Sequence, residues 1–267
     1  MKDVKYTLYG PIPEKNFILT RTNGELKQSE ESKEWEADIK KLMQAEARGW
    51  ISQSDPEYGE YTPLQAIITI HTPKKTILVK QIKALLDALT GVMYMDDCSI
   101  VDLTAERKYS EQEYTELYFR PADKKYIRLP DGEPVSSDRF IRPIKNTAFE
   151  DGHPLDKEKY DGDIDWRKHI RAQFHDQKKQ IEGEYELDAL LGTGHLNDRE
   201  PLKKRLAAYR MDFFPITMPD LDNCCYAILN AVNGGNVLAE DCTKFHLIKK
   251  YYDPATSRNK FWLYNRS

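Results

Sequence analysis

Residues 82–91 read IKALLDALTG, and residues 225–234 read CYAILNAVNG. Both stretches carry small residues at the same spacing, with aliphatic residues between them and a glycine at the end. The apolar residues recur at helical intervals, which predicts one helix over residues 80–90 and a second over residues 223–233, each ended by its glycine. The shared small residues are Ala84, Ala88 and Gly91 in the first stretch and Ala227, Ala231 and Gly234 in the second.

The similarity extends in both directions from these helices. Each copy has a polar helical stretch, then an alternating apolar segment that indicates a strand, then the small-residue helix, an acidic turn and two strand-like stretches. The same order of elements, occurring twice, predicts a tandem duplication. The polar stretches are residues 30–47 and 165–181, the alternating segments are residues 64–70 and 207–214, and the acidic turns are Asp96-Asp97 and Glu240-Asp241.

The repeat divides the chain into two predicted domains. The first covers residues 1–122 and the second residues 139–267. The connector, residues 123–138, contains two prolines and a glycine, which interrupt regular structure. Strands and helices alternate in each copy, so we predict a mixed α/β (α+β) class in which a small mixed sheet carries flanking helices.

Composition excludes several classes of protein. The 267 residues include 40 Lys and Arg against 44 Asp and Glu, a net charge of -4, which argues against nucleic acid coating the whole surface but permits a local basic face. No apolar run approaches the ~18 residues of a membrane helix, and the N-terminus has no apolar signal core. We therefore expect a cytoplasmic protein that does not contact a membrane. The four cysteines have no disulfide or zinc spacing and are expected as buried thiols.

Residues 218–223, MPDLDN, concentrate the chemistry in the second copy. Asp220 and Asp222 project to the same side of an extended segment, and Asp241 enters the next strand, where it can fold back toward them. Three converging carboxylates repel one another unless a cation neutralises them, and oxygen ligands suit Mg²⁺ or Mn²⁺. The residues alone leave an alternative open, in which the aspartates only cap the helix and the later acidic pair is a solvated loop.

The pattern Pro219-Asp220-Leu221-Asp222-Asn223, followed by the helix and Glu240-Asp241, resembles the signature of the RusA family of Holliday junction resolvases. The first copy resembles the later part of that signature, from Lys83 to Gly91 and then Asp96-Asp97, and its residues 8–16 resemble the family's N-terminal strand and Pro-rich turn.

The resemblance implies an Mg²⁺-dependent endodeoxyribonuclease that cleaves branched DNA such as four-way junctions, in DNA recombination and repair, in a bacterial or phage setting. Family members are homodimers, so a fused duplication implies a single-chain pseudo-twofold dimer, either monomeric or paired as a homodimer.

The resemblance also assigns site residues. The catalytic and metal-binding aspartates match Asp220, Asp222 and Asp241. The family's helix lysine falls on Tyr226, a departure for which Lys244 or Lys204 is a candidate substitute. Further candidates in the second copy are Glu240 and Asn223.

The first copy departs in the opposite way. It keeps the helix lysine as Lys83, but Ile77 and Val79 stand at the aspartate positions. We therefore predict that this copy does not hold a metal ion.

DNA contacts require a positive face because phosphate contacts dominate affinity. Two alternatives to an active nuclease remain: a branched-DNA-binding protein that has lost cleavage, and a duplicated structural or interaction module. The candidate DNA-binding residues are Lys74, Lys75, Lys80 and Lys83 in the first copy and Lys203, Lys204, Arg205 and Arg210 in the second.

Overall fold

The computed structural model describes more of the first predicted copy than of the second. The expected strand over 207–214 lies outside the described residues, as do Glu240, Asp241, Lys203, Lys204, Arg205 and Arg210. The described residues are 3–15, 17–19, 26–46, 63–122, 134–137, 149–150, 153–154, 164–174, 184–193, 220–232, 242–252 and 259–265.

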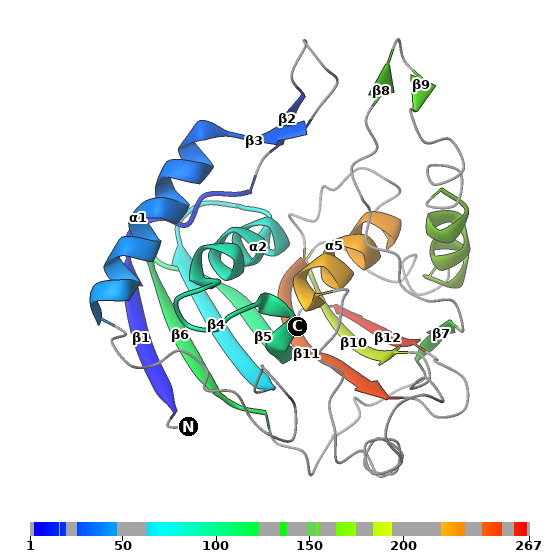
Figure 1. The fold of residues 1–267 in the computed structure, drawn as a ribbon. Coiled ribbons are helices and arrows are strands. Elements are labelled where there is room, and N and C mark those ends of the chain that lie inside the picture. Colours follow the sequence, from blue (N-terminus) through cyan, green and yellow to red (C-terminus); the bar gives the residue numbers. More distant parts are fainter. Residues whose placement is uncertain are drawn as a thin grey trace, which may run out of the picture.

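One eight-stranded mixed sheet runs through the described part of the chain, in the order β1-β6-β4-β5-β11-β10-β12-β7 (Figure 1). Its β-structure and the helices on it confirm the predicted α/β class. The strands, in sheet order, are β1 (Val4–Tyr9), β6 (Tyr114–Pro121), β4 (Leu64–Thr72), β5 (Ile100–Tyr109), β11 (Cys242–Tyr252), β10 (Tyr185–Thr193), β12 (Asn259–Asn265) and β7 (Val135–Ser137). Two short ribbons, β2 (Phe17–Leu19) with β3 (Leu26–Gln28) and β8 (Phe149–Glu150) with β9 (His153–Pro154), stand apart from this sheet.

The two halves of the sheet have the same internal order. In the N-terminal half, β6 is antiparallel to both β1 and β4, and β4 is parallel to β5. In the C-terminal half, β12 is antiparallel to both β7 and β10, and β10 is parallel to β11. The halves meet where β5 pairs with β11 in antiparallel fashion, a junction that we call the seam. The order therefore reads identically from either edge to the seam.

Two helices of equivalent position cover the seam. α2 (Leu78–Leu89) and α5 (Leu221–Val232) pack side by side over β5 and β11 (Figure 1). They begin and end within two residues of the helices predicted over 80–90 and 223–233. Nine of the twelve residues of α2 are buried, which reflects its position between the sheet and the neighbouring helices. Gly91, directly after the C-cap of α2, has a φ of 78°, a conformation that favours glycine.

The predicted polar helices are present as far as the described residues reach, and residues 175–181 of the second lie outside them. α1 (Glu30–Glu46) packs against α2, and residues 164–174 are helical. None of the described helices is long and apolar enough to cross a membrane.

The place of β4 in the C-terminal half of the sheet is occupied by β10. Residues 207–214 lie outside the described residues, so the strand expected there stays a prediction. In β4, side chains alternate between buried and half-buried, as the predicted alternation over 64–70 requires. In β10, residues 187–192 are all buried, which is typical of an interior strand covered on both faces. β10 ends at Thr193 and α5 begins at Leu221, whereas β4 ends at Thr72 and α2 begins at Leu78, so the separation of strand and helix differs between the two halves. β7 lies within the predicted connector, so the second half of the sheet begins before residue 139.

Candidate metal centre

The start of α5 places two buried carboxylates beside the seam. Asp220 directly precedes the helix, and its carbonyl accepts a hydrogen bond from the Cys224 amide at 3.0 Å. Its side-chain Oδ2 accepts from Asn223 Nδ2 at 3.1 Å. Asp222 lies in the first turn and is 1% exposed. Its Oδ1 is buried and has no hydrogen-bond partner among the described residues, which is costly for a carboxylate oxygen.

The acidic turn before β5 faces this helix start. Asp96 caps a short 3₁₀ helix, η1 (Asp97–Ser99), because its Oδ1 accepts from the Cys98 amide at 2.9 Å. This cap holds the turn so that Asp97 lies at the entrance to β5, next to the seam. Asp97 is thereby brought to carboxylates of the other half of the sheet.

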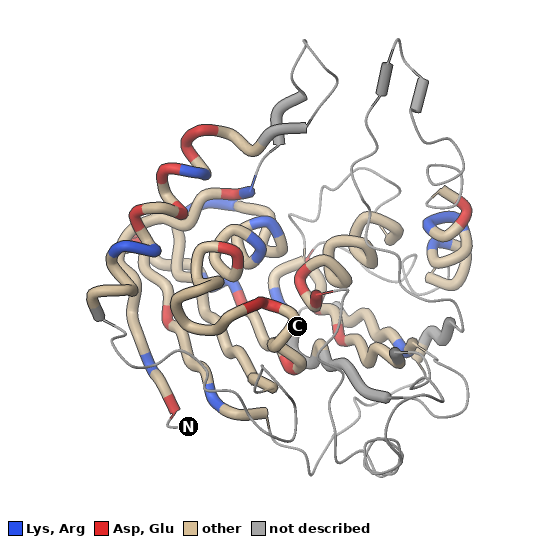
Figure 2. Tube along the Cα trace, in the orientation of Figure 1, with Lys and Arg blue, Asp and Glu red and all other residues tan. Residues whose placement is uncertain are grey.

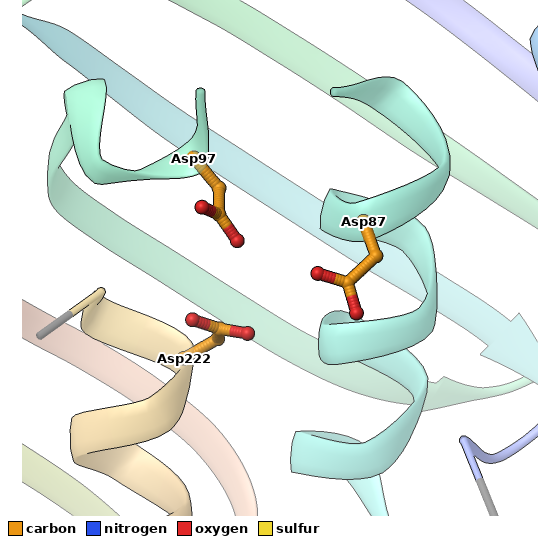
Figure 3. Close-up of side chains that lie close together, drawn as sticks. All are labelled: Asp87, Asp97 and Asp222. Atoms are coloured by element: carbon orange, nitrogen blue, oxygen red, sulfur yellow. The ribbon is translucent and has the colours of Figure 1, made fainter. Parts of the chain in front are cut away.

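Two groups of three carboxylates result, and both contain Asp97. Asp87, Asp97 and Asp222 form the first triad, and Asp96, Asp97 and Asp220 form the second; in each triad, one oxygen from every residue lies within 4.8 Å of the others. Figure 3 shows the carboxylates of the first triad directed toward one another from α2, the turn before β5 and α5. Both triads therefore combine residues of the N-terminal half with one aspartate of the C-terminal half.

Two lysines of the N-terminal half contact carboxylates of the first triad. Lys83 Nζ lies 2.9 Å from Asp222 Oδ2 and 3.8 Å from Asp87 Oδ2. Lys15 also contacts the Asp87 carboxylate, and its Nζ lies 3.1 Å from Glu36 Oε1. A line of alternating charges thus runs from α1 through α2 to α5.

The electrostatics of the cluster follow from its burial. Burial raises the pKa of Asp97 to about 8, and the carboxylates of Asp222, Asp220 and Asp87 add to this effect. For Lys83, burial alone lowers the pKa, but Asp222 and Asp87 raise it above its ordinary value. The lysine is therefore charged at neutral pH, whereas the raised pKa of Asp97 favours its protonated form; a bound cation would favour the ionised carboxylate.

The donor set fits a hard divalent cation. The cluster offers carboxylate oxygens, the ligands that Mg²⁺ and Mn²⁺ prefer. One of its members, Asp222, has a buried Oδ1 without a hydrogen-bond partner among the described residues. Figure 2 shows the acidic stretches of the turn and of the α5 start meeting near the middle of the molecule, beside basic positions of α2.

The remaining predicted site residues that the structure describes lie outside the two triads. Tyr226 is half-buried, and burial raises its pKa. Lys244 lies on β11 with its Nζ 3.8 Å from Glu186 Oε1, outside both triads. Lys74 and Lys75 are exposed just before α2, and Lys80 Nζ lies 3.9 Å from Glu14 Oε2.

Sequence reasoning missed two contributors. The position equivalent to Asp87 in the second copy is occupied by Asn230. This difference between the copies was the sequence signal that could have identified Asp87 as a site residue. Lys15 belongs to the Pro-rich turn, and its contact with Asp87 depends on tertiary packing.

Comparison with known proteins finds a family match in the N-terminal half of the chain. Against curated protein sequences the chain gives no significant match. The family model for endodeoxyribonuclease RusA matches residues 9–118, which include Lys83, Asp87 and the Asp96-Asp97 turn and end before α5. Residues 9–118 are therefore similar to the RusA endodeoxyribonuclease domain.

Proposed function

We propose that the protein is a divalent-metal-dependent endodeoxyribonuclease that cleaves branched DNA such as four-way junctions, in DNA recombination and repair. The observation that carries the proposal is the pair of carboxylate triads around Asp97, of which one member, Asp222, has a buried oxygen without a hydrogen-bond partner among the described residues. The match to the RusA family supports the reaction class.

Asp97, Asp220 and Asp222 are the proposed residues that hold Mg²⁺, or Mn²⁺ in its place. When bound, such an ion supplies an activated water and neutralises charge on the scissile phosphate. Asp96 orients the turn that carries Asp97, and Asn223 orients the Asp220 carboxylate. Asp241, expected from the family pattern, remains a proposed additional ligand.

We also propose that the chain arose by tandem duplication, with a first domain over residues 1–122 and a second domain, predicted over 139–267, that begins with β7 before residue 139. The identical strand order and strand orientations in the two halves of the sheet support this proposal, as does the side-by-side placement of α2 and α5. Such a chain corresponds to a fused pseudo-twofold dimer, which has a binding surface suited to the near symmetry of a four-way junction. DNA contacts are expected from Lys74 and Lys75, which are exposed near α2.

A binding protein without cleavage activity is the second candidate. It is favoured by the two lysines that contact the first triad, because ammonium groups compete with a metal ion for the same carboxylates.

Cleavage assays on defined DNA separate the two candidates. The protein is incubated with a four-way junction, a flap and a plain duplex, in Mg²⁺ or in chelator. We expect Mg²⁺-dependent cleavage of the junction that Asp220→Asn and Asp222→Asn abolish. Asp38→Asn, which changes a carboxylate on the exposed face of α1, is the matched control and should cleave normally.

Two other outcomes of these assays would contradict the proposed nuclease. Tight junction binding without cleavage in Mg²⁺ or Mn²⁺ would establish the binding protein instead. No preference for branched DNA would leave a structural or interaction module.

A further inference from the structure

We propose that the chain contains one cleavage centre assembled from both halves, in which Lys83 of the N-terminal half serves Asp220 and Asp222 of the C-terminal half, and that the equivalent second centre has been lost as a unit. This inference rests on the proposed function and deepens it. It predicts a single incision in each binding event.

The contact across the halves is direct. Lys83 on α2 places its Nζ 2.9 Å from Oδ2 of Asp222 on α5. The lysine side chain is 20% exposed and the aspartate side chain 1% exposed, so little water screens the pair.

Neighbouring charged side chains orient the Lys83 ammonium group toward Asp222. Asp87 lies one turn further along α2, with its Oδ2 3.8 Å from Lys83 Nζ. Lys15 contacts the same carboxylate, and Glu36 in turn contacts Lys15. The arrangement orients the ammonium group toward the other half of the molecule.

The two halves show complementary losses at equivalent positions. Aligning residues 82–91 with 225–234 pairs Lys83 with Tyr226, and the same alignment pairs Ile77 and Val79 with Asp220 and Asp222. The half that lost the aspartates kept the lysine, and the half that lost the lysine kept the aspartates.

One physical cause accounts for both losses. The lysine of one half pairs with the aspartates of the other half. A lysine at position 226 would therefore need aspartates at positions 77 and 79, which are occupied by the buried Ile77 and Val79. Lys83 keeps its partners, because Asp220 and Asp222 are present. A half-buried ammonium without such partners is costly, so tyrosine at 226 relieves the cost. The retained set, Lys83 with Asp97, Asp220 and Asp222, is intact.

Lys83 acts through Asp222 and is therefore a positioning residue with an electrostatic role. Its charge lowers the attraction of the site for a cation, so its removal should tighten Mg²⁺ binding while slowing cleavage. A lysine needed only for folding would weaken both together. This opposite sign distinguishes the two roles.

The test uses the whole 267-residue chain and a plasmid that extrudes a four-way junction. One incision yields a nicked circle, and paired incision within one binding event yields a linear molecule. The variants are Lys83→Met, Lys83→Arg, Tyr226→Phe and the double variant Lys83→Met with Tyr226→Lys. Mg²⁺ affinity is measured by calorimetry, and folding by thermal unfolding; Lys83→Gln replaces the Met variant if the latter is unfolded.

We expect nicked circles from the wild type and from Tyr226→Phe. Lys83→Met should cleave about 100-fold more slowly while binding Mg²⁺ at least as tightly, and Lys83→Arg should recover part of the rate. The double variant should stay as slow as Lys83→Met, because its lysine lies in the wrong half.

Several results would overturn the inference. These are full cleavage by Lys83→Met, loss of its Mg²⁺ binding, rescue by the double variant, or linear product from a single bound chain. Absence of junction cleavage by the wild type would instead count against the proposed function, so the two failures are distinguishable.

Discussion

The carboxylates of Asp97 and Asp222 lie within 4.8 Å of each other, although one belongs to the turn before β5 and the other to the first turn of α5. Burial and this proximity raise the pKa of Asp97 to about 8. A bound cation would reverse the effect, because it favours the ionised carboxylate.

Binding of Mg²⁺ should therefore release a proton. Below pH 8, Asp97 is protonated in the metal-free protein and must ionise to bind the cation, so about one proton should be released at pH 7. Calorimetry in buffers of different ionisation enthalpy measures this number. Asp97→Asn should bind Mg²⁺ weakly and release none, and an unchanged proton count in that variant would contradict the assignment.

The stability of the metal-free protein should fall as pH rises toward 8. The unfolded chain loses the Asp97 proton near the ordinary pKa of 3.8, whereas the folded protein keeps it until about pH 8. The folded state therefore binds more protons within this window, so the free energy of unfolding decreases by at most about 1.4 kcal/mol per pH unit for this group. Urea titrations between pH 5 and pH 8 in chelator provide the measurement. Asp97→Asn should show a shallower slope, and an identical slope would assign the dependence to other groups.

Asp87→Asn should reduce cleavage less than Lys83→Met does. The substitution removes a carboxylate that orients Lys83 but leaves the 2.9 Å contact between Lys83 and Asp222. Loss of one such contact is expected to raise the activation free energy of cleavage by about 1 kcal/mol, which lowers the rate about fivefold. Single-turnover nicking gives the rate. Lys33→Met, which removes a lysine from an exposed pair on α1, is the control and should leave the rate unchanged.

The seam should make the two halves unfold together. Phe245 on β11 is fully buried and lies opposite Ala105 on β5. Phe245→Ala should destabilise the protein by about 3–5 kcal/mol while preserving a single unfolding transition, followed by circular dichroism and fluorescence. Tyr109→Ala removes an aromatic side chain that is 79% exposed and should cost less than about 0.5 kcal/mol. Two separate transitions in the wild type would show that the halves fold independently.

Much of the fold is readable from local sequence. The helical period of apolar residues locates α2 and α5 within two residues, and strict alternation locates β4. These signals are local. Side chains on the buried face recur about every 3.6 residues in a helix and every second residue in a strand, so a short stretch of sequence is enough to recognise either element. The expectation of a matching strand over 207–214 rests instead on constant spacing between the copies. The structure shows that this spacing is not constant, because β10 lies further from α5 in the chain than β4 lies from α2.

The sequence by itself determined the class of fold, the two small-residue helices and the concentration of acidic residues in two turns, since each depends on residues close together in the chain. Only the tertiary structure decided which carboxylates meet. Asp222 faces Asp97 and Lys83 because β5 pairs with β11 and sets α2 beside α5. That pairing joins residues far apart in the chain, and local periodicity carries no information about which half supplies the partner.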